Sequence, residues 1–315
     1  DSVRGIGNML NSHNSAVQWS SAGYFTSFDV DGYSIGTTNS LNRMDNAQIG
    51  YGWKAGGVPT GNGKRRINDS ASEITLSASG SPGTDSTLYN SGFQYVKQSV
   101  NSAGQFSITQ YQAPNITSGS AITIPHGLTG SPDFIVIKAT TNANNWHVWH
   151  DNVGNRQTGY LHLDLPDAET NSINPFGNTV PSATHITLGI SGNVNYGARQ
   201  YIMYSWKAVA GVSAFGVYTG TGTSGLTHQY ADSNQFTARF IIIKCLSNAG
   251  AWLMHDTFRG MPERISVNTT AAGLTDTGTQ NYYPTPTADG FSYPTTVSDG
   301  GWNATGYTYL YMAFA

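Results

Sequence analysis

The stretch YLYMAFA at residues 309–315 is the pattern that organises the whole sequence. Two earlier stretches resemble it, YIMYSWKA at residues 201–208 and QIGYGWKA at residues 48–55. Each alternates small and aromatic residues and follows a turn rich in Asn, Gly or Asp, which is typical of a β-strand. Three such closing stretches, each preceded by similar landmarks, predict an internal repeat.

The clearest landmarks join the second unit of this repeat to the third. PDFIVIK at residues 132–138 is matched by ARFIIIK at residues 238–244, and WHVWHD at residues 146–151 is matched by WLMHD at residues 252–256. The offset between the Asp residues that end these motifs is 256 − 151 = 105 residues, a plausible size for one small β-domain. The stretches that begin at Phe106 and at Phe215, near the start of each unit, also have similar residue types and are aligned here.

The first unit contains only the later landmarks. DSVRG at residues 1–5 matches DTFRG at residues 256–260, and FDVDGY at residues 28–33 parallels ADGF at residues 288–291. The apolar strand of the earlier half has no counterpart, and half a sandwich exposes an apolar face and unpaired strand edges. We therefore expect residues upstream of Asp1 in the full gene, or another chain or domain, to cover this half.

The remaining pattern predicts an all-β fold. Short runs of β-branched and aromatic residues are separated by Gly, Asn, Asp, Ser and Pro, and no long run has helical periodicity. We predict tandem β-sandwich-like repeats of about 105 residues after a partial first repeat. The predicted divisions are a first half-unit at 1–57, an insertion or linker with a possible hairpin at 58–105, and two full units at 106–211 and 212–315.

The apolar strands have hydrophobic residues on both faces. Alternation places Phe134 and Val136 on one face of the strand and Ile135 and Ile137 on the other, and the third unit repeats this pattern at residues 240–243. Strands that are apolar on both faces lie between layers, which favours a sandwich or an inter-chain core.

Composition excludes several classes of partner. Charged residues make up 10% of the chain, against about 25% in ordinary soluble proteins, so the surface is covered by uncharged polar residues, as is common in extracellular and virion proteins. The net charge is −3, and the run Lys64 to Arg66 is too short to bind nucleic acid. Cys245 is the single cysteine, which excludes an intramolecular disulfide and suits a small buried hydrophobe. No apolar run reaches the roughly 18 residues that membrane insertion requires.

The order and spacing of the landmarks resemble a repeat family of structural proteins from tailed phages, especially phages of marine cyanobacteria and of abundant ocean heterotrophs. The chain departs from that family at residues 226–228, where LTH replaces a His-Gly-Leu loop, and at Trp302, where the family has small polar residues. The resemblance implies a virion appendage and a further sandwich module ahead of the DSVRG landmark. The motifs that carry it lie at residues 1–5, 27–33, 53–55, 105–108, 126–128, 132–138, 146–151 and 309–315.

From this resemblance we expect a non-enzymatic structural protein of a phage virion, a tail-fibre or receptor-binding segment that contacts the host surface. Its expected location is the virion, outside the cell, and its expected partners are a host-surface glycan or protein and other virion proteins. By analogy with phage fibres we expect a homotrimer, since a low charge lets subunits pack without burying ions. The alternatives are a carbohydrate-binding adhesin module of a cell-surface protein and a polysaccharide depolymerase.

We predict no catalytic residues, no metal and no cofactor. The pairs His150-Asp151 and His255-Asp256 could provide general base chemistry, but adjacent residues on a strand point to opposite faces, which favours structural hydrogen bonds. His126 and His147 are also interpreted as structural. The densest carboxylate cluster, DLPDAE at residues 164–169, gives no sign of a converging catalytic pair.

Asp29 and Asp31 open a DVDG motif that resembles the start of a calcium loop. The twelfth position from Asp29 is Ser40, where an EF-hand needs Glu, so the motif predicts a turn and leaves a calcium site of another kind open.

The best binding candidates are aromatic residues in polar, glycine-containing loops. Aromatic faces stack on sugar rings, and neighbouring amides and carboxylates bond hydroxyls. The alternative is that these rings close the ends of the sandwich. The candidates are Tyr196 and Arg199 in the second unit and Tyr282, Tyr283 and Trp302 in the third.

Overall fold

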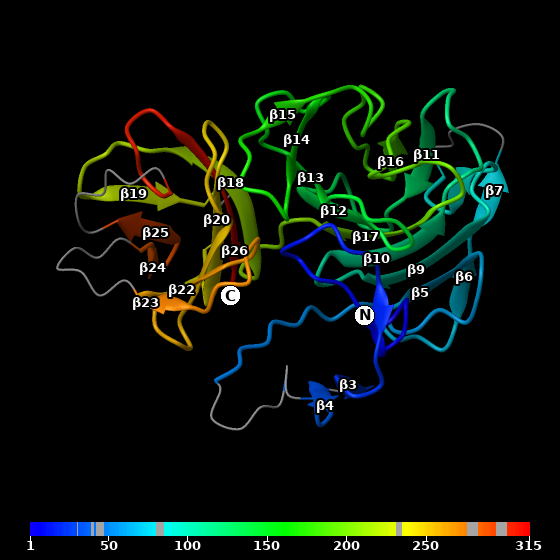
Figure 1. The fold of residues 1–315 in the computed structure, drawn as a ribbon, viewed down its shortest axis with the longest axis horizontal. Coiled ribbons are helices and arrows are strands. Elements are labelled where there is room, and N and C mark those ends of the chain that lie inside the picture. Colours follow the sequence, from blue (N-terminus) through cyan, green and yellow to red (C-terminus); the bar gives the residue numbers. More distant parts are fainter. Residues whose placement is uncertain are drawn as a thin grey trace.

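The computed structural model describes residues 1–29, 31–38, 41, 47–79, 85–230, 235–275, 283–293 and 301–315. All regular structure in these ranges is β-sheet, which confirms the predicted all-β class. Over the same ranges, the chain has no helix of the length and hydropathy that crossing a bilayer requires. Figure 1 shows the second and third units side by side, with the first unit below their junction.

The second unit is built on a nine-stranded sheet. Every neighbouring pair is antiparallel except β5 and β9, which are parallel. A second layer, β11 (Ile122–Pro125) and β16 (His185–Leu188), covers one face of this sheet. In sheet order the nine strands are β15 (Thr170–Asn171), β14 (Gly159–His162), β13 (His147–His150), β12 (Phe134–Ala139), β17 (Gln200–Trp206), β10 (Phe106–Gln112), β9 (Tyr95–Asn101), β5 (Lys64–Ile67) and β6 (Glu73–Thr75).

The third unit repeats the central part of this order in a six-stranded sheet. Its closing strand β26 lies between β18 and β20, as β17 lies between β10 and β12. The sheet comprises β18 (Ser213–Thr219), β26 (Thr308–Phe314), β20 (Phe240–Cys245), β21 (Leu253–Asp256), β22 (Glu263–Ser266) and β23 (Leu274–Thr275). Its covering layer comprises β19 (Leu226–Gln229), β25 (Gly290–Tyr293) and β24 (Thr285–Thr287).

The two large sheets pack against each other through their second faces. Ile135 and Ile137 of β12 lie in the core of their own unit, whereas Phe134 and Val136 join a shared cluster with Ile242 of the third unit. The rings of Phe134 and Phe215 stack across this junction with centroids 6.1 Å apart. Each central strand is therefore buried on both faces, as its continuous apolar sequence predicts.

The register of the sheets corrects one sequence match. Phe106 lies opposite Trp206, whereas the residue opposite Phe314 is Ser213. The residue equivalent to Phe106 is therefore Ser213. The sequence match aligns Phe106 with Phe215, two positions later.

The stretch predicted as an insertion or linker adds strands to the second unit. β9 pairs with β10, and Val96 and Val100 of β9 are fully buried. β5 and β6 extend the sheet beyond β9. β7 (Ser77–Ser79) and β8 (Leu88–Asn90) form a parallel pair, and β8 contacts β11.

In its described residues the first unit has two small strand pairs and no large sheet. β1 (Asn8–Met9) pairs with β2 (Trp19–Ser20), and β3 (Phe25–Phe28) pairs with β4 (Tyr33–Ile35). Residues 47–55, which include the whole closing stretch predicted as a strand, form no strand. The reason is physical: β17 and β26 each lie between two neighbours, and no described strand flanks residues 47–55.

Candidate functional site

The loop between β16 and β17 carries the candidates Tyr196 and Arg199. Gly197 and Ala198 between them take the left-handed conformation, with φ of +57° and +58°. The amide of Gly197 donates to the Ile116 carbonyl at 2.8 Å, and the Arg199 amide donates to Tyr196 at 3.1 Å. The turn is thus tied both to itself and to the segment after β10, which fixes the two side chains relative to each other.

The Arg199 side chain covers one face of Tyr196. Its guanidinium carbon lies 4.9 Å from the ring centroid of Tyr196, within the range of a cation–π contact. Nη1 of Arg199 donates to Oδ1 of Asn144 at 3.1 Å and to the Gly192 carbonyl at 3.3 Å. Both candidate side chains are partly exposed, so the ring and the guanidinium lie in place at the surface before any ligand binds.

Sequence reasoning missed Asn144, which belongs to the loop between β12 and β13. The signal available was the polar run TTNANN at residues 140–145. The two loops meet at a second point, since the Gln200 amide donates to Oγ1 of Thr141 at 3.1 Å. A planar ring bordered by a guanidinium and by amide and hydroxyl groups can bind a polyhydroxylated ligand such as a sugar.

The third unit gives a different result for Trp302, which is fully buried with 0% of its surface exposed. Its ring packs against His255, with centroids 4.8 Å apart, and lies 5.5 Å from the guanidinium carbon of Arg264. The expectation that Trp302 meets a ligand is therefore wrong for this structure, because side chains from β21 and β22 cover its ring. Trp302 instead fits the alternative, in which the aromatic ring closes the end of the sandwich.

The other two candidates of the third unit do not form a comparable site. Tyr283 is partly buried and packs against the core of its unit. Tyr282 lies outside the described residues. The loop with Tyr196 and Arg199 is therefore the candidate site that the structure brings together.

The His-Asp pairs take separate structural partners. The ring of His255 contacts the Met261 carbonyl through Nδ1 at 2.7 Å, whereas Asp256 accepts from Nε of Arg259 at 2.6 Å. In the second unit, Nδ1 of His150 accepts from the Asn152 amide at 3.0 Å. Burial lowers the pKa of His150 and of His255 to about 4, so both rings are neutral at pH 7.

His126 and Asp164 also make structural contacts. Burial lowers the pKa of His126 to about 4, and its Nδ1 accepts from the Leu128 amide at 3.2 Å. Oδ1 of Asp164 accepts from the Trp146 amide at 3.0 Å. At the DVDG motif, whose Val30 lies outside the described residues, the Asp29 amide donates to the Gly32 carbonyl at 2.9 Å and Phe28 pairs with Tyr33, as the predicted turn requires. Within the described ranges, no three His, Cys, Asp or Glu residues are grouped so as to hold a metal ion.

Comparison with known proteins places the chain in one family. Residues 77–315 match the family described as "Domain of unknown function (DUF7483)", a range that covers the third unit and all of the second except β5 and β6. The chain therefore belongs to this family. No curated protein and no solved structure matches the chain.

Proposed function

We propose that this chain is a non-enzymatic structural protein of a phage virion, a tail-fibre or receptor-binding segment that contacts a glycan on the host surface. The observation that carries the proposal is the fixed pair of Tyr196 and Arg199, anchored by Asn144 at the surface of a layered β-scaffold. A low content of charged residues and the resemblance of the landmarks to phage repeat proteins support the location.

The structural roles of the acids and histidines support binding over catalysis. A depolymerase needs two carboxylates that face each other across a sugar. In the densest acidic cluster, Asp164 accepts from the Trp146 amide, and Glu169 accepts from the Gly154 amide at 2.8 Å. These two carboxylates hold loops of the scaffold, so the cluster favours a structural role.

The binding proposal is tested on a glycan array with the whole chain and two variants. Tyr196→Ala removes the ring of the candidate site, and we expect affinity for a bound glycan to fall about tenfold, roughly 1.4 kcal/mol. Tyr95→Ala is the matched control, because Tyr95 is also partly exposed and has Nζ of Lys97 5.8 Å from its ring centroid, but lies on β9. Equal losses in both variants would count against this site, and release of reducing ends from host polysaccharide would favour the depolymerase alternative.

Location and assembly need separate measurements. Labelled antibodies against the chain should mark a tail or other surface appendage in electron micrographs of the phage. A genomic neighbourhood with portal, capsid and tail-tube genes agrees with the phage proposal, whereas secretion or anchoring genes favour the adhesin alternative. Mass photometry should find a homotrimer, and a clean monomer of the intact protein contradicts that part of the proposal.

A further inference from the structure

The second unit contacts the first in the same way as the third contacts the second. Nε1 of Trp146 donates to the Asn11 carbonyl at 2.8 Å, and Nε1 of the equivalent Trp252 donates to the His162 carbonyl at 2.9 Å. The two acceptors are 162 − 11 = 151 residues apart. In both the second and the third unit, the same face of the large sheet therefore contacts the same part of the preceding unit.

Two buried lysines repeat this relation. Nζ of Lys138 donates to the Ser15 carbonyl, and Nζ of Lys244 donates to the Pro166 carbonyl, both at 3.1 Å. These acceptors are also 166 − 15 = 151 residues apart. Both lysines are fully buried, so a main-chain oxygen from the neighbouring unit is part of what solvates each ammonium.

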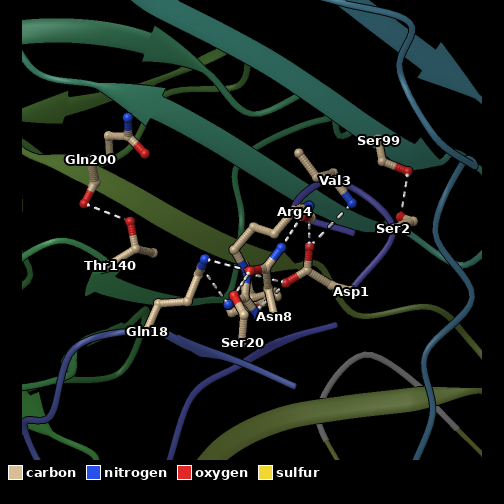
Figure 2. A network of polar contacts seen from close by, with 11 residues as sticks. Asp1, Ser2, Val3, Arg4, Asn8, Gln18, Ser20, Ser99, Thr140 and Gln200 are labelled. Carbon is tan, nitrogen blue, oxygen red and sulfur yellow. Dashed lines mark hydrogen bonds and ion pairs between the residues drawn. The ribbon is translucent and has the colours of Figure 1, made fainter. Parts of the chain in front are cut away.

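A third contact connects the first unit to the third. The hydroxyl of Tyr204 in the second unit donates to Oδ2 of Asp1 at 2.7 Å, and the hydroxyl of Tyr51 in the first unit donates to Oδ2 of Asp256 at 2.8 Å. Each Asp also accepts from Nε of the Arg three residues later, at 2.6 Å in both cases. Figure 2 shows this turn in the first unit, with Asp1 and Arg4 beside Asn8, Gln18 and Ser20.

The contacts thus run in one cyclic order, from the second unit to the first, from the third to the second and from the first to the third. Trp53 of the first unit lies where the three meet, with its ring centroid 5.7 Å from that of Trp206 and 5.5 Å from that of Phe314. The three units therefore surround a common centre, to which the described part of the first unit contributes residues after its Asp-x-x-Arg-Gly turn, including Trp53.

The described residues of the first unit lack strands at defined places. In the third unit, β20 and β21 lie between the closing strand β26 and β22, and β18 lies on the other side of β26. In the first unit, β1 takes the place of β22 and residues 49–53 take the place of β26, with no described strand between them. Among the described strands the covering layer lacks a strand too, because β25 pairs with both β19 and β24 whereas β4 pairs with β3 alone.

Apolar side chains are exposed where these strands are missing. Tyr33 and Ile35 of β4 are 43% and 40% exposed, whereas Phe291 and Tyr293 of the equivalent β25 are both 0% exposed. A surface hollow of about 540 Å³ lies in this unit, and a second, of about 440 Å³, lies between this unit and Val58 and Lys97. Phe25 and Phe28 of β3 line them, one in each hollow.

We propose that this open side of the first unit is a docking surface for a β-segment of the same type as residues 212–255, supplied by polypeptide outside residues 1–315. The segment would add its strands between β1 and residues 49–53, beyond residues 49–53, and beside β4. Its Trp and Lys would reach the third unit near Ser266 and Thr270, which lie 266 − 11 = 255 and 270 − 15 = 255 residues after Asn11 and Ser15. The other two units supply the template, since each fills these positions with its own earlier strands.

The test places a copy of residues 212–255 directly ahead of Asp1 in the whole chain, because Asp1 is equivalent to Asp256. We expect amide exchange in residues 49–53 to slow at least about tenfold, as these amides gain partners on both sides. The control graft carries Ile241→Asp and Ile243→Asp in the copied segment, which puts charges on the face that meets β3 and β4. It should leave exchange at the level of the ungrafted chain.

A second graft provides an independent test in case the first graft misfolds. Residues 106–150, which precede Asp151 in the second unit, replace the first segment ahead of Asp1. Protection of residues 49–53 by either graft supports the proposal, and exchange unchanged in both overturns it. The proposal also fails if the ungrafted chain already protects these amides and loses that protection on dilution, because a second copy then covers this face.

Discussion

The first and third units share one turn and differ in what surrounds it. Asp1 with Arg4 and Asp256 with Arg259 form the same closed turn, each with a tyrosine hydroxyl on the carboxylate. The third unit continues to β26, which is paired on both edges. The corresponding residues 49–53 of the first unit form no strand.

The closing stretch therefore does not form a strand on the strength of its sequence alone. QIGYGWKA and YIMYSWKA have similar patterns, yet only the second is a strand, in β17. Preference for β-structure depends on cross-strand and same-face neighbours more than on the backbone itself. The following predictions test how far the stability of the complete units depends on burial that the first unit lacks.

The largest expected effect is acid destabilisation of the second and third units. Burial lowers the pKa of His126, His150 and His255 to about 4, against an unfolded value near 6.5. Between pH 6.5 and 4 the unfolded chain binds protons that the folded chain does not, so stability falls as the pH falls. The loss is about 1.4 kcal/mol per pH unit for each histidine.

Urea unfolding at pH 7, 5.5 and 4.5 measures this dependence. His255→Asn keeps a polar atom near the position of Nδ1 and cannot titrate, so it should reduce the slope by about a third of the three-histidine contribution. Of the eight histidines in the chain, only His13 lies in the first unit. Midpoints that do not change between pH 7 and 4.5 would contradict the assignment of these rings as buried and neutral.

The next effect compares two tryptophans. Trp252 is fully buried and its Nε1 donates to the His162 carbonyl, whereas Trp53 is 36% exposed beside the missing strands. Trp252→Ala should destabilise the protein by about 3–5 kcal/mol, because it leaves a large cavity and an unpaired carbonyl. Trp53→Ala should cost no more than about 2 kcal/mol.

Chemical denaturation at pH 7 measures the free energy of unfolding of both variants. The dependence of that free energy on denaturant concentration should be the same in each variant, so that the two values can be compared. A loss for Trp53→Ala as large as that for Trp252→Ala would mean that the centre of the three units is already closed in the isolated chain. That result would also weaken the case for an open docking surface.

Much of the fold could be predicted because its determinants are local. Apolar residues on both faces of residues 134–138 and 240–244 indicate strands between layers, and the structure places a core on each side of them. The match of Phe106 with Phe215 failed because register is set by the partner strand. Tyr111 stacks on Tyr201 and Tyr218 stacks on Tyr309, with centroids 5.2 and 5.1 Å apart, so Tyr111 is equivalent to Tyr218.

The candidate site was predictable in part for the same reason. Tyr196 and Arg199 are close in sequence and belong to one turn, so the loop pattern identified both. Asn144 comes from another loop, and only the folded chain brings it to Arg199. Trp302 has polar neighbours in sequence, but its burial depends on His255 and Arg264, which belong to distant strands.

The smallest expected effect tests whether the contacts around the centre are equivalent. Tyr51→Phe and Tyr204→Phe each remove a hydroxyl that donates to a landmark carboxylate. Tyr51→Phe should cost about 1 kcal/mol, because Arg259 still pairs with Asp256. Tyr204→Phe should cost about twice as much, since its hydroxyl also accepts from Nη2 of Arg4 at 3.3 Å.

Hydrogen exchange locates each effect, which a global unfolding measurement cannot do. Tyr51→Phe should speed exchange at residues 256–260 of the third unit, and Tyr204→Phe should speed it at residues 1–5 of the first. These responses connect the first unit to the third and the second unit to the first, as the cyclic order requires. If Tyr51→Phe leaves residues 256–260 unchanged while Tyr204→Phe loosens residues 1–5, the contact between the first and third units contributes no stability, and the equivalence of the three units is limited to their folds.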